Sequence, residues 1–425
     1  MKLLRSDAIV ISAFGAVTPL GGSYDELHVA LREGRSGIRR IEKFDCSTYT
    51  TEHAGVPDEG NERVRWPSAR RVGTEQLYGE LAAARLLAQA PFVARDYAPE
   101  RIGCLVGVDA PATDVQSALE LVDKLKDEKS RDALIRVLVS HMRMSEFVSG
   151  DATAVFGAIH RHIPFSGCAL AHVGLCSASL QAIGMGMLAL RQGRIDAAIV
   201  GGVSGKVNPL NLARLESLDV ISTDLKLDPR HRSRPFDTRR SGFVLAEGAV
   251  LFLIERESAV RARGDTPLGR VAGYGASLAA EHIVIPHLQS LEMRLAMQRA
   301  LADAGCAPGD IDYINAHGTS TVLNDKHESE AIRAIFPMQP RIPVTANKSQ
   351  HGHLIATAGA MEVLNTVIGL RERFIPATIN LDEQAQECPV NVVRAPMPSH
   401  ARRVLKNSFG MGGLAASLVL EGAAA

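Results

Sequence analysis

The chain has 425 residues, long enough for two or three domains or for one large two-part domain with a substantial core. Lysine plus arginine and aspartate plus glutamate are equal at 47 each, which argues against a general nucleic-acid or membrane-surface partner. The six cysteines form no CxxC pair, so neither a disulfide framework nor a zinc ribbon is predicted, and a reducing, cytoplasmic location is favoured.

The first predicted strand lies in DAIVISAFGAVTP (7–19), an apolar run too short for a membrane span and too interrupted for a signal peptide. Its turn does not fit the GxGxxG pattern of nicotinamide or flavin binding. Next, ERVRWPSARRVG (62–73) places four arginines close together: Arg63, Arg65, Arg70 and Arg71. The cluster is either an ordinary solvated face or a docking site for an acidic partner.

A second short strand and a polar loop follow in APERIGCLVGVDAPATD (98–114). The chain then becomes charged and helix-periodic across about 112–150, as in DVQSALELVDKLKDEKSRDALIRVLVSHMRM, which predicts one or two amphipathic helices. We interpret this segment as an insert that shapes a pocket or a dimer interface.

The stretch HVGLCSASLQAIGMGMLALRQGRIDAAIVGG (172–202) carries a candidate nucleophile. Cys176 precedes a run in which Leu180, Ile183, Met187 and Leu190 recur at helical spacing. Free amides and the helix dipole stabilise a thiolate at a helix start, so its pKa is expected to fall from roughly 8.5 toward neutrality. Such a thiolate could attack a thioester carbonyl. The alternative is a packing residue, because free cysteines are commonly buried.

Four segments of the first half recur in the same order in the second half. The pairs are 7–19 with 268–280, 98–114 with 307–325, 172–202 with 351–381, and 242–255 with 408–421. Short apolar strands alternate with helical patterns in both, which indicates mixed α/β layers. The alternative is that any two α/β segments look alike. We predict an N-terminal half (1–260) with the cysteine and the insert, and a C-terminal half (261–425) with candidate histidines.

The second half supplies His317 in INAHGTST (314–321), at a strand end, where open α/β sheets place their sites. It also supplies Lys348 and His353 in NKSQHGHLIATAGAME (347–362), before a helix of small residues that can approach another backbone closely. Taken singly, each histidine could cap a buried carbonyl and the lysine could be a surface charge. A metal site of His317, His351 and His353 is considered, but no carboxylate or cysteine completes a known ligand spacing, so no metal is predicted.

The segments GLCSAS, RPFDTRRSGFVLAEGA, INAHGTST, NKSQHGHLIATAGAME and NSFGMGG, in this order, resemble the elongating β-ketoacyl-acyl carrier protein synthases of fatty acid and polyketide synthesis. The similarity covers nearly the whole chain. It implies an α/β thiolase-type fold, two duplicated half-domains in five α-β-α-β-α layers, and a dimer. It also implies condensation of malonyl-acyl carrier protein with an acyl chain, without a cofactor other than the phosphopantetheine that arrives on the carrier.

The resemblance also implies residue roles. Cys176 would take the acyl chain, His317 and His353 would polarise the malonyl thioester, and Lys348 would support the histidines. The amides of Cys176 and Met411 would form an oxyanion hole. Further implied residues are Thr319 and Thr321 at the phosphopantetheine arm, Phe409 and Met411 at the substrate, Glu362 as a buried support, and the four arginines as a weak carrier dock.

Four positions depart from the family pattern. Leu175 replaces a common alanine, Met411 a common phenylalanine, Ser241 a common aspartate, and Leu414-Ala415 the usual TN. These changes and the insert favour a specialised polyketide or polyene synthase, either a homodimer or a heterodimer with a chain-length-factor-like subunit.

Three rival classes are weighed against the motifs. Thiolases need a second cysteine in the C-terminal glycine-rich loop, and NSFGMGG has none. Initiating synthases have asparagine instead of the second histidine, so His353 argues against them. A catalytically silent chain-length factor lacks the active cysteine, yet it stays an alternative if Leu175 or Met411 blocks the site.

Overall fold

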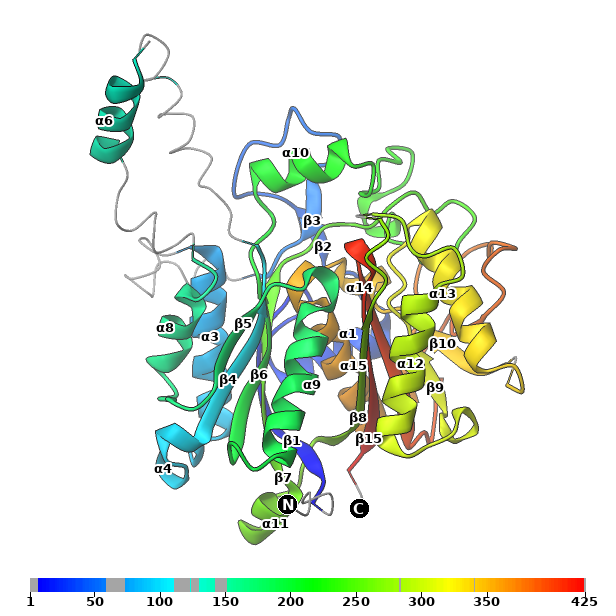
Figure 1. Ribbon diagram of the computed structural model, residues 1–425. Helices are drawn as coiled ribbons and strands as arrows, with labels where there is room; N and C mark the ends of the chain where they lie inside the picture. Colours follow the sequence, from blue (N-terminus) through cyan, green and yellow to red (C-terminus); the bar gives the residue numbers. More distant parts are fainter. Residues whose placement is uncertain are drawn as a thin grey trace.

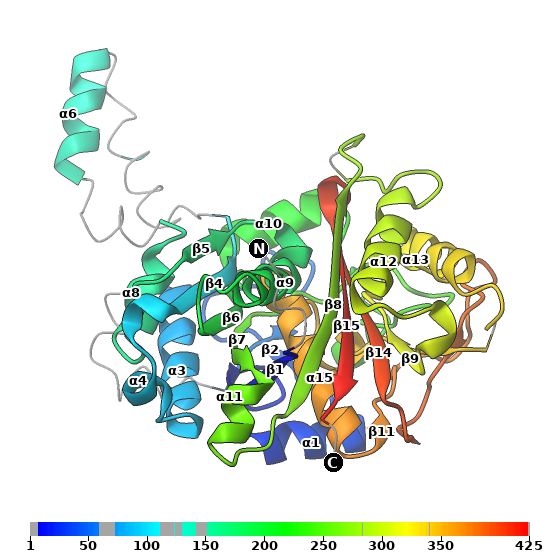
Figure 2. The ribbon, with the colours of Figure 1, turned by 60° about the horizontal axis from the view of Figure 1, so that its bottom comes forward.

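A computed structural model of the chain describes residues 7–58, 73–110, 123, 130–141, 151–282, 284–339 and 341–423. The four clustered arginines of 62–73 lie outside the described residues. Most of the predicted insert does too. Its described part is Asp123, Ser130 and the helix α6 (Arg131–His141), and α6 stands apart from the body of the molecule in Figures 1 and 2. A pocket or interface role for the insert stays a prediction.

The strands of the first half have the order β5-β4-β6-β7-β1, in which β5, β4 and β6 are parallel and β7 runs antiparallel to both of its neighbours. Their bounds are β1 Ile9–Val17, β4 Ile102–Val108, β5 Ala169–His172, β6 Ala197–Ser204 and β7 Gly248–Arg256.

The second half repeats this topology. Its order is β10-β9-β14-β15-β8, with the same parallel and antiparallel neighbours, and β12 extends the edge. The bounds are β8 Gly269–Leu278, β9 Tyr313–Asn315, β10 Pro343–Thr345, β12 Asn391–Val392, β14 Arg403–Gly410 and β15 Leu414–Gly422. The halves meet where β1 pairs with β8 at Val10–Arg270 and Ile11–Gly269. The two halves thus share one strand order, as the sequence echoes predict.

Helices cover both faces of each half-sheet and form five α-β-α-β-α layers (Figures 1 and 2). The outer layer on β1 and β7 holds α3 (Thr74–Gln89) and α8 (Ala154–His160), the central layer holds α9 (Ala178–Arg191) and α15 (Ala358–Arg371), and the far layer holds α12 (Leu291–Ala304) and α13 (Val322–Ile335). The predicted layered α/β fold is confirmed.

Further helices and strands are shorter. They are α1 (Tyr24–Glu33), β2 (Ile38–Arg40), β3 (His53–Gly55), α4 (Val93–Asp96), α10 (Pro209–Ser217), α11 (Glu257–Ala262), α14 (Lys348–His351), β11 (Phe374–Ile375) and β13 (Met397–Pro398). No described helix has both the length and the apolar character needed to cross a membrane.

The central helices are buried on nearly every side because both half-sheets cover them. Small residues let them approach closely: a Cβ added at Gly359 of α15 would lie 3.0 Å from the Cβ of Leu180 on α9. A Cβ at Gly184 would lie 2.3 Å from the ring of Tyr274 on β8. The small residues therefore allow the close helix approach that was predicted. This close packing sets the positions of the N-terminal ends of α9 and α15, and with them the position of the site.

Candidate active site

The two central helices begin with the same irregular turn. The short helices Leu175–Ser177 and Ile355–Thr357 lead directly into α9 and α15. Each starts at a non-glycine residue with positive φ, 49° at Leu175 and 43° at Ile355, a conformation that costs about 1–3 kcal/mol and is typical of functional sites. Cys176 therefore occupies the helix start in the first half.

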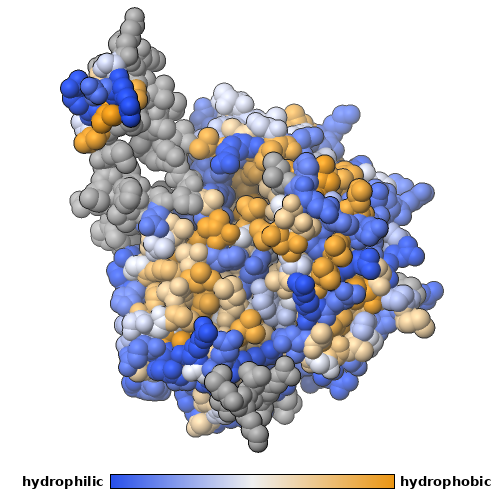
Figure 3. All heavy atoms as spheres, in the orientation of Figure 1, coloured by the Kyte–Doolittle hydropathy of each residue, from blue (hydrophilic) through white to orange (hydrophobic). Residues whose placement is uncertain are grey.

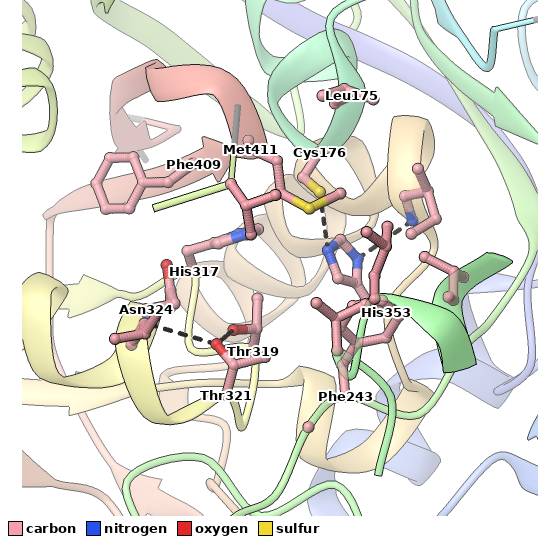
Figure 4. A pocket seen from close by; sticks show the side chains of 18 of the residues that line it. Leu175, Cys176, Phe243, His317, Thr319, Thr321, Asn324, His353, Phe409 and Met411 are labelled. Atoms are coloured by element: carbon pink, nitrogen blue, oxygen red, sulfur yellow. Dashed lines mark hydrogen bonds between the residues drawn. The ribbon is translucent and has the colours of Figure 1, made fainter. Parts of the chain in front are cut away.

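Cys176 lines a cavity of about 510 Å³ whose walls come from both halves. Figure 4 shows the side chains of Cys176, His317, His353 and Met411 converging there. The glycine-rich turn lies against the nucleophile, because a Cβ at Gly410 would be 3.5 Å from the Cys176 nitrogen. Predicted residues from distant motifs therefore meet in one cavity.

The expected lowering of the Cys176 pKa is wrong. Burial raises the pKa of its thiol to about 12; the Asp109 charge acts in the same direction, while the Lys348 charge opposes both. The sulfur is enclosed by the two halves, and the loss of hydration outweighs the dipole of α9. At neutral pH the group is a thiol, which ionises only as it reacts.

His353 contacts the sulfur directly, with 3.1 Å between its Nε2 and Cys176 Sγ. Its Nδ1 accepts a hydrogen bond from the Ile355 amide at 3.2 Å. The neutral ring therefore carries its proton on Nε2, directed at the sulfur. Burial holds the pKa of His353 well below its usual value, and the Lys348 charge acts in the same direction. The ring is thus a neutral hydrogen-bond donor toward the cavity.

His317 lies two residues after β9, and hydrogen bonds to its main chain and its side chain hold it in place. Glu328 of α13 accepts hydrogen bonds from the His317 and Gly318 amides, both at 2.8 Å. The Lys348 ammonium lies 3.0 Å from His317 Nδ1, so Nδ1 is the acceptor and Nε2 carries the proton. Burial, with the charge of Lys348, holds the pKa of His317 well below its usual value. The two rings cross nearly at right angles, with centroids 5.4 Å apart.

Glu362, on α15, supports this arrangement. Its Oε1 lies 2.5 Å from Lys348 Nζ, and both side chains are fully buried. Lys348 also donates to the His317 carbonyl oxygen at 2.5 Å. Because buried charges require partners, the Lys348 and Glu362 side chains are held in place together.

The remaining predicted residues also line the cavity. The Thr319 and Thr321 hydroxyls lie 2.9 Å apart, and the ring of Phe409 faces that of His317 at 6.0 Å between centroids. Figure 4 shows the Met411 side chain directed at Cys176 and His353. Leu175 and Met411, the two residues that could block the site, line the same cavity as Cys176, and Cys176 is still part of the cavity wall.

Among the described residues, one set of donors could hold a metal ion: a ligand atom from each of Cys176, His317 and His353, all within 4.8 Å of one another. This set differs from the one considered from the sequence, because the Nδ1 of His351 faces the Gly352 oxygen at 2.7 Å. The Lys348 ammonium beside His317 would repel a divalent cation. The prediction that no metal is used stays a prediction.

Sequence reasoning missed two buried charged residues at this site. Asp109, directly after β4, lines the cavity and accepts from Ser204 Oγ at 2.7 Å, and burial raises its pKa to about 7. Lys406 lies on β14 with its ammonium 2.7 Å from Glu362 Oε2. The available signals were an acid at the end of an apolar strand (VGVDAPA) and a lysine in an apolar strand pattern (VLKNSF).

Comparisons with known proteins agree with this fold and site. The model of the β-ketoacyl synthase N-terminal domain matches residues 6–259, and that of the C-terminal domain matches residues 268–382. The chain is 32% identical to the 3-oxoacyl-[acyl-carrier-protein] synthase 2 of Synechocystis sp. over 97% of each protein. A protein of the same name from Vibrio cholerae is 30% identical over 97% of this chain and 98% of that protein.

Solved structures give the same result. A β-ketoacyl synthase from Burkholderia phymatum superposes with a TM-score of 0.86 at 27% identity, covering 98% of this chain and 99% of that one. The ishigamide ketosynthase/chain length factor gives 0.86 at 26% identity, with the same coverage. The fold is therefore that of the thiolase-type condensing enzymes. Within that class, the chain belongs to the β-ketoacyl synthase family.

Proposed function

We propose that this chain is a β-ketoacyl-acyl carrier protein synthase that joins an acyl group held on Cys176 to the two-carbon unit of malonyl-acyl carrier protein. The observation that carries the proposal is the 3.1 Å contact between His353 Nε2 and Cys176 Sγ, with His317 facing the same cavity. The names of the relatives, 3-oxoacyl-[acyl-carrier-protein] synthase 2, support the same reaction.

In the first step the Cys176 sulfur attacks the thioester carbonyl of an acyl carrier. The carbon–sulfur bond to phosphopantetheine breaks, a new thioester forms on Cys176, and the thiol proton ends on the departing phosphopantetheine sulfur. The positive N-terminal end of α9, the His353 Nε2–H and the Lys348 charge stabilise the sulfur as it ionises. Amides of Cys176 and Met411 are proposed as donors to the carbonyl oxygen.

In the second step malonyl-acyl carrier protein enters the emptied arm site. Its bond to the carboxylate breaks, carbon dioxide leaves, and the electron pair forms an enolate whose oxygen receives hydrogen bonds from the Nε2–H groups of His317 and His353. The enolate carbon attacks the acyl carbonyl, and the Cys176 sulfur leaves and regains a proton. Neutral imidazoles suit this role, because each offers one fixed N–H and transfers no proton.

The thioester substrates reach the cavity on the phosphopantetheine arm, for which Thr319 and Thr321 are proposed contacts. No separate cofactor takes part in the proposed reaction. Docking of the acidic carrier on Arg63, Arg65 and Arg70–Arg71 stays a proposal about residues outside the described part of the chain. A cytoplasmic location is also proposed, since all six cysteines are free.

A dimer is part of the proposal. Figure 3 shows apolar side chains gathered over the middle of the face that carries β5 and α9, and Val173 and Leu188, at the ends of these elements, are 45% and 38% exposed. Among the described strands, β5 lies at the edge of the sheet, the position at which a strand of a second subunit can pair. The likeness to the ishigamide ketosynthase/chain length factor supports a specialised polyketide or polyene synthase. It also allows a partner that resembles a chain-length factor.

Intact-protein mass spectrometry tests the proposal. The protein is mixed with acyl carrier thioesters that are saturated, polyenoic or aryl, and malonyl-acyl carrier protein is then added. We expect an acyl adduct that Cys176→Ala abolishes and that malonyl-acyl carrier protein discharges as an elongated product. A wild-type protein that forms no adduct with any thioester would refute the synthase and favour the silent subunit.

A further inference from the structure

Lys406 is a fully buried lysine that no predicted step uses. It lies on β14 among neighbours in the strand that are also buried, and its ammonium is surrounded by oxygen atoms. Glu362 Oε2 lies 2.7 Å from Nζ, and the carbonyl oxygens of Asn315 and Ala316 lie at 3.4 and 3.3 Å. The Asn407 carbonyl oxygen also accepts from it. A cation in such a cradle is held in one position.

The partner of Lys406 leads directly to the catalytic histidine. Glu362 binds Lys406 through Oε2 and Lys348 through Oε1, and Lys348 contacts His317 Nδ1 at 3.0 Å. Four fully or almost fully buried side chains therefore form a continuous row from β14 to the cavity. Any change in the charge or position of Glu362 reaches His317 through one intervening lysine.

The charges explain why two lysines are needed. A buried pair of one ammonium and one carboxylate can become neutral by moving a proton between its members, and the geometry of the pair then loosens. A second ammonium, that of Lys406, gives each carboxylate oxygen of Glu362 a cationic partner and so holds the carboxylate in one orientation. Lys348 can then donate at the same time to Glu362, to His317 Nδ1 and to the His317 carbonyl oxygen.

We propose that Lys406 is a positioning residue for malonyl decarboxylation: its buried ammonium holds the Glu362 carboxylate directed at Lys348, which in turn holds the Nε2–H of His317 toward the cavity. This inference rests on the proposed synthase activity. It assigns Lys406 chiefly to the second step, because the row ends on His317, whereas Cys176 and His353 do not contact the row through hydrogen bonds. Within the row, only the charges of Lys348 and Glu362 act on the sulfur.

The two ammonium groups of this cluster, on Lys348 and Lys406, also suit the step. Facing Lys406 are Glu362 of α15, Lys348 and His351 of α14, Glu328 of α13, and the two catalytic histidines. The charges of Lys348 and Lys406 help keep the two catalytic imidazoles neutral, and they favour the enolate that forms when carbon dioxide leaves. Burial lowers the pKa of Lys406 to about 8, and the Lys348 charge acts in the same direction. The ammonium is therefore present below that pH and lost above it.

Two substitutions separate a positioning role from a structural one. Lys406→Met keeps the length of the side chain and removes the charge. Lys406→Ala also opens a space lined by oxygen atoms, into which ammonium or methylammonium can enter. Lys226→Met removes a lysine from an exposed loop and serves as the matched control. Acylation of Cys176 is measured by intact mass, and decarboxylation by carbon dioxide released from malonyl-acyl carrier protein.

We expect both Lys406 variants to acylate Cys176 at a rate within about threefold of wild type and to lose on the order of 100-fold in decarboxylation kcat, with little change in KM. The decline of wild-type decarboxylation above about pH 8 should be missing in Lys406→Met. Ammonium should restore Lys406→Ala by at least about tenfold and leave Lys406→Met unchanged.

Decarboxylation at the wild-type rate in Lys406→Met would overturn the inference and leave the synthase intact. Equal losses in both half-reactions, with no response of Lys406→Ala to ammonium, would also overturn it, because they indicate only a folding role. A wild-type protein that neither acylates nor decarboxylates would instead refute the proposed function. The comparison of Lys406→Ala with and without ammonium is made on one protein sample, so a folding difference between variants cannot produce it.

Discussion

Replacing His353 by alanine should separate the two half-reactions. The ring contributes one Nε2–H, 3.1 Å from Cys176 Sγ and directed into the cavity. In decarboxylation this N–H is one of two donors to the enolate oxygen, and removal of one preorganised donor costs about 100-fold to 1,000-fold in kcat, equal to about 2.7–4 kcal/mol. In acyl transfer it is one of several groups at the sulfur, and its loss should cost about tenfold.

The assay measures each step alone, with acylation followed by intact mass and decarboxylation by carbon dioxide release from malonyl-acyl carrier protein. His400→Ala, at an exposed position far along the chain, controls for the loss of an imidazole. The reasoning would be refuted if His353→Ala slowed both steps equally, or if it left decarboxylation unchanged. Either result would mean that the Nε2–H does not bind the enolate oxygen.

Other predictions follow from the same contacts. Because burial raises the Cys176 pKa to about 12, alkylation by iodoacetamide should accelerate about tenfold per pH unit from pH 7 to 10, and a plateau below pH 9 would contradict this. Lys348→Met should slow alkylation further at every pH, since its charge lowers that pKa; alkylation at the wild-type rate would show that the charge does not act on the sulfur. Gly184→Ala should destabilise the fold by about 1–3 kcal/mol in chemical denaturation, because its Cβ would meet the Tyr274 ring. Gly157→Ala, with no atom within 4 Å of the added Cβ, should be neutral or stabilising by up to about 1 kcal/mol, and similar losses in both would refute the packing argument.

Much of the fold and of the site could be predicted from local patterns. The echo between 172–202 and 351–381 predicted two equivalent helices, and these are α9 and α15, side by side between the half-sheets. Cys176, His317, Lys348 and His353 stood in recognisable motifs, and the structure brings them to one cavity. Taken singly, these residues left structural roles open; the motifs in their order, through their resemblance to the β-ketoacyl synthases, predicted that they form one site.

The electrostatics of the site could not be predicted in this way. The helix start alone suggested a low pKa for Cys176, yet enclosure by the second half raises it. Lys406 and Glu362 are 44 residues apart in the sequence, and their pairing exists only because β14 and α15 pack together.

The sequence by itself therefore determined which groups could react and in which order the strands and helices follow one another, since both depend on local patterns. The tertiary structure decided which groups are charged, which nitrogen of each histidine carries the proton, and which buried lysine supports the site. The physical reason is that hydration and Coulomb interactions depend on distances across the core, and the chain sets those distances only when its two halves have packed together.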